Sequence, residues 1–172
     1  NNKIEYKNVK ARYIVFCEGF QLKRNPWFSY LPLEGSKGEF LHIRSKVLSQ
    51  KKIIKAGLFI VPIEKDLFWV GANFDRKDKT SKPTISGKDW ILVKLKSLLD
   101  SPFEVVDHKA AIRPTVKDRR PLLGAHPKQK NLYIFNGLGS RGVLMGPLLA
   151  KWMYKFVVEK KKLYPELAIN RF

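Results

Sequence analysis

The sequence of 172 residues contains one cysteine, Cys17, which excludes an internal disulfide bond. A single cysteine suits a reducing compartment such as the cytoplasm. Because Cys17 sits in an apolar run, we expect a buried, unreactive thiol rather than a nucleophile. The histidines show no ligand spacing with one another or with Cys17, so we expect no metal site. They are His42, His108 and His126.

Long uncharged apolar segments are also absent. The opening residues, NNKIEYK, lack the apolar core of a signal peptide. The most apolar stretch near the C-terminus is interrupted by Lys151 and Lys155, and it is too short for a membrane span. We therefore expect a soluble cytoplasmic protein. Its hydrophobic content of 44% is enough for one substantial core.

Acidic residues are scarce. Fifteen Asp and Glu face 34 Lys and Arg, which gives a formal net charge of +19. Such an excess raises the possibility of a nucleic-acid partner or another anionic surface. Most of the cations are lysines spread along the chain, beside turns or at a helix end, as is typical of solvated surface. They include Lys51, Lys52, Lys55, Lys77, Lys79, Lys82 and Lys160 to Lys162.

The most informative motif lies in Asn131–Pro147, where an apolar strand runs into a glycine loop that opens a helix. Gly137, Gly139 and Gly142 spell G-x-G-x-x-G, the pattern of dinucleotide-binding loops. Only 30 residues follow Gly142, and no second parallel strand is expected among them. The loop is thus no ordinary first turn of a Rossmann unit. It either directs a helix N-terminus at an electron-rich group or serves tight packing alone.

Hydrophobic periodicity predicts the remaining elements. We expect strands over Ala11–Phe16, buried on both faces, and over Glu39–Arg44, Phe103–Arg113 and Leu132–Phe135, with a hairpin of Phe59–Ile63 and Leu67–Ala72. We expect helices over Ser86–Asp100, with a capping box of Ser86 and Asp89, and over Val143–Lys161, with an apolar stripe of Leu144, Leu148, Trp152 and Phe156. Terminal strands that look parallel, around an antiparallel middle, indicate an α+β fold with an inserted β-rich domain.

Five stretches, in this order, resemble the C-terminal half of the D-amino-acid oxidase and glycine oxidase family of FAD-dependent enzymes, which includes sarcosine oxidase. They are ARYIVFCEGF (11–20), LEGSKGEFLHI (33–43), FIVPIEKDLFWVGA (59–72), AIRPTVKDRRPLLG (111–124) and the glycine loop, and the closing Arg171-Phe172 also fits. Individually the motifs are weak, but five in the right order are specific.

The resemblance implies a domain organisation. Residues 1–20 and 112–172 would be remnants of the FAD-binding domain with its parallel sheet, and residues 21–111 would form the antiparallel substrate-binding domain. The family's N-terminal βαβ unit, which holds the ADP half of FAD, is not in this sequence. We therefore expect a fragment whose partner is that N-terminal half. Alone it would be inactive and would bind FAD weakly or not at all.

The resemblance also implies which residues hold the cofactor. In the family, the helix after the glycine loop faces the pyrimidine edge of the flavin. The cofactor-binding residues here would be Gly137, Gly139, Ser140, Arg141, Gly142, Val143 and Leu144. Sarcosine-oxidase-type members attach FAD to a cysteine near the segment of Arg113. This chain has none there, so its FAD would be non-covalent.

Arg113 falls on the family arginine that binds a substrate carboxylate, so the resemblance makes it the catalytic and substrate-binding candidate. A guanidinium suits that role because it donates two parallel hydrogen bonds. Phe59 stands where amino-acid oxidising members often carry a tyrosine hydroxyl, which puts a plain α-amino acid substrate in doubt. Arg141 points at the flavin or substrate, or is simply solvated. Asp118 is expected to brace the turn of Arg119–Pro121.

The leading hypothesis is an FAD-dependent oxidoreductase that oxidises an amine or amino-acid C–N bond by hydride transfer to flavin. The alternative is a flavin domain associated with tRNA or RNA modification, docking on nucleic acid through its basic surface. A third hypothesis is a scaffold that keeps the fold without the chemistry.

Overall fold

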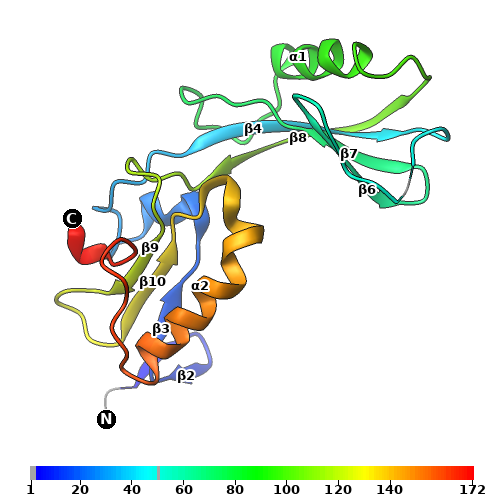
Figure 1. The fold of residues 1–172 in the computed structure, drawn as a ribbon. Helices are drawn as coiled ribbons and strands as arrows, with labels where there is room; N and C mark the ends of the chain where they lie inside the picture. The colour runs from blue at the N-terminus through cyan, green and yellow to red at the C-terminus, as the bar shows by residue number, and fades with distance from the viewer. Residues whose placement is uncertain (1–2, 50) are drawn as a thin grey trace. The chain divides into compact units, whose positions relative to one another are not determined.

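The computed structural model describes residues 3–49 and 51–172 of the chain (Figure 1). The chain forms two compact units, each with its own hydrophobic core. The first unit combines two segments, Asn1–Gly35 and Arg113–Phe172, and the second is the continuous stretch Ser36–Ile112. No helix within the described ranges combines the length and apolar character that crossing a membrane requires.

The first unit is built on a sheet in the order β3-β10-β9. Strand β3 (Ile14–Phe16) runs parallel to β10 (Leu132–Asn136), and β9 (Leu122–Ala125) pairs antiparallel with β10. A short hairpin of β1 (Ile4–Tyr6) and β2 (Val9–Ala11) precedes this sheet. Parallel neighbours from the two ends of the chain confirm the expected interrupted sheet.

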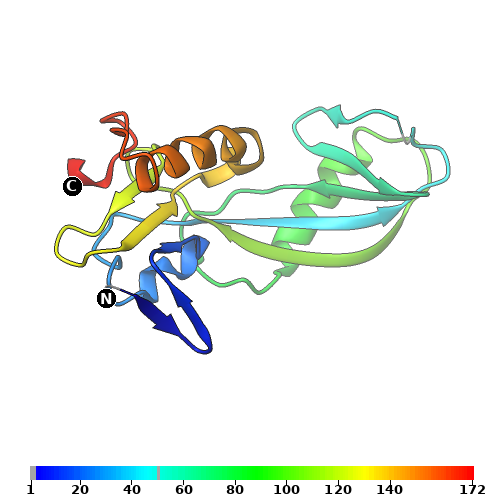
Figure 2. The same ribbon diagram turned by 90° about the horizontal axis from the view of Figure 1, so that it is seen from below.

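Successive side chains of a strand point to opposite faces, so this sheet has apolar side chains on both faces. A different segment of the chain packs against each face. Helix α2 (Gly142–Val157) lies along one face, as Figures 1 and 2 show. Its core cluster is Leu123, Tyr133, Leu149, Met153, Val157 and Leu167. The other face packs against the short helix η1 (Gly19–Arg24) and the segment after it. That cluster includes Leu22, Phe28, Leu31, Val116, Leu122 and Ile134.

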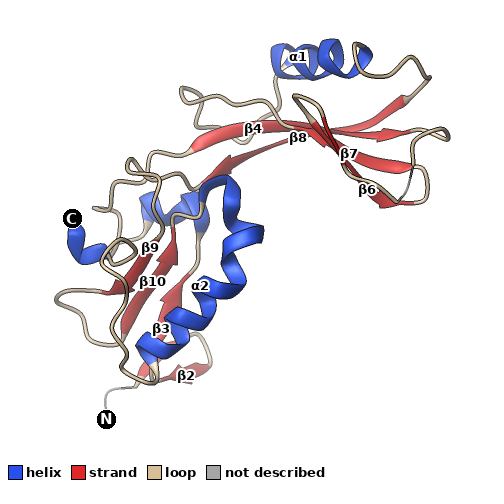
Figure 3. Cartoon of the chain, in the orientation of Figure 1, coloured by secondary structure: helices blue, strands red, loops and turns tan. Residues whose placement is uncertain are grey.

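The second unit is a five-stranded sheet with one helix, α1 (Ile85–Lys96) (Figure 3). Its strand order is β5-β6-β7-β4-β8. The strands are β4 (Ser36–Arg44), β5 (Ile54–Lys55), β6 (Phe59–Glu64), β7 (Leu67–Gly71) and β8 (Glu104–Arg113). Ile91 and Leu95 of α1 pack on the face that carries Leu41, Ile43, Ile60, Phe68 and Val70. The expected hairpin is confirmed as β6 and β7, which pair antiparallel.

The expected strand Ala11–Phe16 is wrong in two respects. The chain turns after Ala11, so this residue ends β2, and β3 begins at Ile14. The strand is also not buried on both faces, since Val15 is 39% exposed. Strand β3 lies at the edge of the described sheet, where one side has no neighbouring strand. Cys17 comes after β3 and is exposed, which corrects the expected buried thiol.

Both predicted helices extend too far. Helix α2 ends at Val157, and its buried stripe is Leu149, Met153 and Val157. The predicted stripe is rotated from this face, so Leu144 and Leu148 are exposed. Helix α1 ends at Lys96, and its N-cap is Thr84 rather than Ser86. Thr84 has extended dihedral angles and its hydroxyl accepts from the Gly87 amide at 3.0 Å, whereas Ser86 already lies in the first turn.

Candidate functional site

The carboxyl ends of the two parallel strands are fastened together by Asn136, the last residue of β10. Its side-chain amide donates to the Gly19 carbonyl at 2.9 Å, and its carbonyl accepts from the Gly137 amide at 2.8 Å. Asn136 is buried. The glycine loop therefore begins from a fixed point at the edge where ligands of α/β sheets bind.

Two glycines give the loop its shape for different reasons. Gly137 has φ +74°, and a Cβ there would lie 2.6 Å from Val116 Cγ2 and 3.0 Å from the Leu122 nitrogen. Gly139 has φ +56°, and its nearest described neighbour to a Cβ would be Thr115 Oγ1 at 4.0 Å. Gly137 thus serves close packing and a left-handed backbone. Gly139 allows the left-handed backbone of the turn, and it leaves the backbone surface without a side chain.

Helix α2 begins directly after this loop. A short helix, η2 (Gly139–Arg141), leads into α2 at Gly142, and the side chain of the N-cap residue of α2, Arg141, makes no capping hydrogen bond. The first N–H groups of a helix have no partners within it and carry partial positive charge. Beside them, Val143 is 98% exposed and Leu144 is 80% exposed. This N-terminus can receive an electron-rich group with an apolar body.

Arg113 is joined to the glycine loop through the residues that follow it. The Gly139 amide donates to the Pro114 carbonyl at 3.1 Å, and the Thr115 amide donates to the Arg113 carbonyl at 2.8 Å. Arg113 is half-buried, and burial lowers the pKa of its guanidinium. Because the ordinary pKa of arginine is so high, the side chain remains a cation. The structure thus brings the backbone that follows Arg113 into contact with the glycine loop.

Arg141 and Asp118 both form hydrogen bonds with the backbone of the loop that follows Arg113. Arg141 Nη2 donates to the Arg119 carbonyl at 3.0 Å. Asp118 accepts from the Arg120 amide at 3.0 Å, which confirms the expected bracing of the turn, and from Arg171 Nε at 2.8 Å. Burial raises the pKa of the Asp118 carboxyl, but the hydrogen bonds from Arg171 and the Arg120 amide, with the charges of both arginines, together outweigh burial and lower the pKa overall.

Phe59 lies in the second unit, on the face of the sheet opposite α1. It pairs with Gly71 across β6 and β7, and alternation puts it on the same face as Trp69 and Phe40. The rings of Phe40 and Trp69 are 5.3 Å apart. Phe59 is partly exposed, with Lys55 Nζ 5.4 Å from its ring centroid. This face therefore carries three aromatic side chains, of which Phe59 is exposed.

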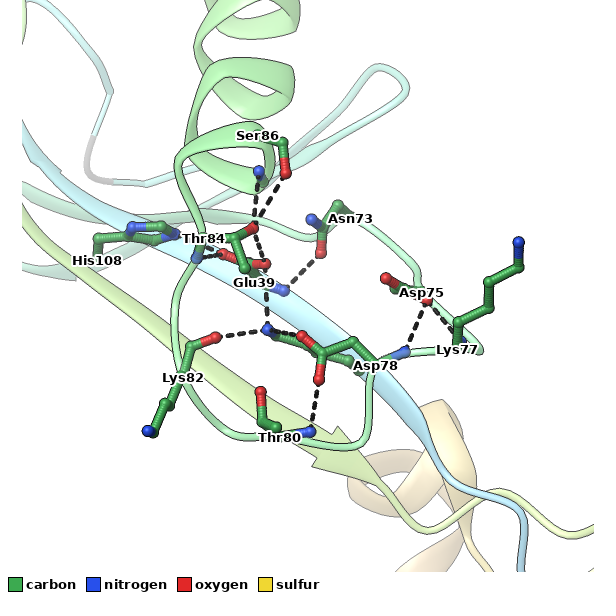
Figure 4. A network of polar contacts seen from close by, with 12 residues as sticks. Glu39, Asn73, Asp75, Lys77, Asp78, Thr80, Lys82, Thr84, Ser86 and His108 are labelled. Carbon is green, nitrogen blue, oxygen red and sulfur yellow. Dashed lines mark hydrogen bonds and ion pairs between the residues drawn. The ribbon is translucent and has the colours of Figure 1, made fainter.

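Sequence reasoning missed a buried ionic network in the second unit (Figure 4). Lys37, only 1% exposed, donates through Nζ to Asp78 at 2.6 Å and to the Lys82 carbonyl. Burial lowers the pKa of Lys37, but the hydrogen bond and charge of Asp78, with the charge of Glu39, outweigh burial and raise it overall.

Glu39 is the second anion of this network. Its carboxylate accepts from the Thr84 amide at 2.8 Å and the Thr84 hydroxyl at 2.7 Å, and it lies 2.9 Å from His108 Nε2. Burial raises the pKa of Glu39, while the Thr84 hydrogen bonds and Lys37 lower it more. The alternation of side chains along β4 puts Lys37 and Glu39 on the same face as Leu41. The sequence therefore contains a signal that two charged side chains point toward the core.

Within the described residues, no group of three or more His, Cys, Asp or Glu side chains is arranged to hold a metal ion. The polar clusters of both units are instead ion pairs and hydrogen bonds that hold loops in place.

Comparison with known proteins identifies the chain's relatives. The model of the family described as FAD dependent oxidoreductase matches residues 2–155. Glycine oxidase of Bacillus subtilis is 25% identical over 90% of this chain and 43% of its own length. The tRNA 5-methylaminomethyl-2-thiouridine biosynthesis bifunctional protein MnmC of Marinobacter nauticus is 32% identical over 86% of this chain and 26% of its own length.

Solved structures give the same result. The crystal structure of glycine oxidase from Geobacillus kaustophilus has a TM-score of 0.72 and 25% identity, and the match covers 90% of this chain and 43% of that one. Iminodiacetate oxidase from Chelativorans sp. BNC1 shares the fold, with a TM-score of 0.73 and 20% identity over 91% of this chain and 45% of that one. The chain thus spans less than half the length of these relatives.

Proposed function

The chain belongs to the family of FAD-dependent oxidoreductases, and from this premise we propose that the whole protein oxidises the C–N bond of an amine or amino acid by hydride transfer to flavin. In this proposal the first unit is the FAD-binding domain and the second the substrate-binding domain, and the protein works in the cytoplasm. The observation that carries the proposal is the hydrogen bond that joins the glycine loop to the Arg113 segment.

The open backbone of the loop supports a flavin site. A Cβ at Gly139 would meet one described atom, at 4.0 Å, and a Cβ at Gly146 would meet none within 4 Å, so the backbone is open to a flat ring. The bound FAD supplies an acceptor for two electrons and a proton. The amides of Val143 and Leu144 would face the edge of the ring that gains negative charge. Gly137, Ser140, Arg141 and Gly142 complete the proposed cofactor site.

FAD in this site would be non-covalent. The sole cysteine, Cys17, is exposed beyond the end of β3 and is not part of the Arg113 segment. We propose that this chain alone does not retain FAD, because it spans 43% of the glycine oxidase it matches. The remaining part of such an enzyme, an N-terminal half that holds the ADP moiety, is the proposed partner.

Arg113 would bind the carboxylate of the substrate. An arginine guanidinium carries two parallel N–H donors that match a carboxylate, and the partial burial of Arg113 strengthens its interaction with an anion. Holding the substrate C–H against the flavin is the main task of such a site, so positioning dominates over acid–base chemistry. Arg141 and Phe59 are the further proposed substrate-binding residues. Phe59 offers no hydrogen-bond donor, which favours a substrate bulkier than a plain α-amino acid.

The visible absorption spectrum of the whole protein tests this proposal. We expect a flavin band that is bleached, without oxygen, by one of a panel of amines and amino acids. Arg113→Ala is expected to keep the band and slow the bleaching. A colourless protein that takes up no added FAD would contradict the proposal. A yellow protein whose turnover ignores Arg113→Ala would favour a scaffold without chemistry at this residue.

The second candidate function is a flavin domain that acts on RNA. Two observations favour it: several relatives are named for tRNA modification, and the net charge is +19. Binding of a tRNA transcript, measured at increasing salt, tests it. The logarithm of the binding constant should fall linearly with the logarithm of salt concentration, with a slope set by the number of phosphates contacted. Salt-insensitive or undetectable binding would leave the lysines as solvated surface.

A further inference from the structure

We propose that the second unit carries a nucleotide-binding cleft on the α1 side of its sheet. The cleft has a volume of about 630 Å³, within the range of small-ligand pockets. Glu39 of β4, the segment Ala72–Lys77 and the start of α1 line it. Glu39 lies on the α1 side of the sheet, opposite the face of Phe59. The cleft is therefore distinct from the proposed substrate-binding face, and the inference does not rest on the oxidase function.

Two aromatic side chains form the walls of the cleft. Phe74 is 58% exposed and Trp90 is 41% exposed, although both line a concave site. Exposed rings in a cleft offer flat surfaces on which a base can stack. The stacking energy is available to any base, since every base has a π-face.

Cations surround these rings. The Arg76 guanidinium lies 5.4 Å from the Phe74 ring centroid, and Lys94 Nζ lies 4.8 Å from that of Trp90. Lys77 lines the cleft beside Arg76 and is exposed. Basic side chains interleaved with aromatic ones are the arrangement that binds a base together with its phosphate.

The acidic groups of the cleft are already engaged. Glu39 accepts two hydrogen bonds from Thr84 and lies 3.5 Å from Lys37 Nζ. Asp75 accepts from the amides of Lys77 and Asp78 at 2.6 and 3.2 Å. Paired in this way, the two carboxylates repel a phosphate less than free ones would. Arg76 and Lys77 then set the sign of the charge at the rim.

The network of Figure 4 holds the cleft in shape. Lys37 binds Asp78 and the Lys82 carbonyl, and Glu39 binds Thr84, so both ends of the segment after the cleft are tied to β4. The backbones of Lys37 and Asp75 also exchange hydrogen bonds at 2.7 and 3.0 Å. A preformed site avoids the entropic cost of ordering a loop on binding. This gives the buried ions a role in presenting Phe74.

Isothermal titration calorimetry of the whole protein, loaded with FAD and then freed of unbound FAD, tests the cleft. The probes are uridine monophosphate, a single-stranded oligouridylate of seven nucleotides, and inorganic phosphate. Binding of either nucleotide probe, weakened about tenfold by Phe74→Ala or Trp90→Ala, supports the proposal. Trp90→Phe should bind nearly normally, and circular dichroism checks that each variant is folded.

The two nucleotide probes distinguish the source of the ligand. Equal affinity for both indicates a free nucleotide, whereas tighter, strongly salt-dependent binding of the oligonucleotide indicates a nucleotide within a strand. Arg76→Gln should weaken the binding of both nucleotide probes. The matched controls, Tyr154→Ala on the exposed face of α2 and Lys65→Gln at the β6–β7 turn, should leave the binding of both nucleotide probes unchanged. Absence of binding, binding of phosphate alone, or equal losses in the controls would overturn the proposal.

Discussion

The Gly139 amide donates a hydrogen bond to the carbonyl oxygen of Pro114, with a nitrogen–oxygen distance of 3.1 Å. This one contact joins the glycine loop at the start of α2 to the residue that follows Arg113. The position of the proposed carboxylate-binding group is therefore coupled to that of the proposed flavin-binding loop. A substitution that shifts the backbone of either segment should therefore shift the other.

Arg113→Lys is expected to raise KM for a carboxylate-bearing substrate by about tenfold or more, because losing one hydrogen bond to a charged group costs about 1.5–3 kcal/mol. Lysine keeps the charge but lacks the planar fork of donors. Steady-state kinetics of the whole protein measures this. Lys117→Arg, an exposed change in the same loop, is the control and should leave KM unchanged. An Arg113→Lys enzyme with normal KM would remove Arg113 from the binding site.

Gly137→Ala is expected to destabilise the first unit by about 1–3 kcal/mol, the cost of a strained left-handed backbone. The new Cβ would also lie 2.6 Å from Val116 Cγ2. Gly146→Ala, in the interior of α2 with no described atom within 4 Å of a Cβ, should instead stabilise by about 0.5–1 kcal/mol. Urea unfolding measures both. Similar effects of the two substitutions would mean that the loop tolerates a side chain at Gly137.

Much of the fold could be predicted from the sequence, because the strands of the second unit show clear alternation and the glycine loop is punctuated by turn residues. Strand β8 and the β6–β7 hairpin are examples. The error in the end and the buried face of α2 has a physical cause. The end of α2 at Val157 and its buried face at Leu149 and Met153 depend on which side meets β9 and β10, and many faces of so apolar a helix satisfy the spacing.

The sequence predicts the two segments of the candidate site but not the contact between them. The glycine spacing and the Arg113 motif mark the two segments, but their contact depends on a backbone hydrogen bond at Pro114, which no side-chain pattern encodes. Alternation along β4 places Lys37 and Glu39 on the face of Leu41, but it does not identify the partner of Lys37. Its partner Asp78 is 41 residues away along the chain, in a loop whose charges look solvated.

Thr84→Ala is expected to destabilise the second unit by about 1–2 kcal/mol, the range for loss of an N-cap. The Thr84 hydroxyl accepts from Gly87 and donates to Glu39, so the substitution removes two hydrogen bonds. Ser86→Ala is the matched control, since the sequence pattern pointed to Ser86 as the cap. It should change stability by less than about 0.5 kcal/mol. Thermal unfolding distinguishes them, and the reverse order would move the cap to Ser86.

Acid should destabilise the protein through Asp78. The hydrogen bond from Lys37, with those from Thr80, lowers the pKa of the Asp78 carboxyl from 3.8 to about 2. A pKa lower in the folded than in the unfolded state stabilises the fold above the unfolded value. That stabilisation is lost as the pH falls through the folded value. The free energy of unfolding should therefore decrease between about pH 4 and pH 2.

Asp78→Asn isolates this contribution, because the variant has no carboxylate to protonate. We expect it to be less stable than the wild type at pH 7 and to approach wild-type stability as the pH falls toward 2. Urea midpoints measured across this range show the convergence. Asp89→Asn, on the exposed side of α1, controls for the loss of one negative charge and should follow the wild-type curve. Parallel curves for wild type and Asp78→Asn would show that the Lys37–Asp78 pair does not set the acid response.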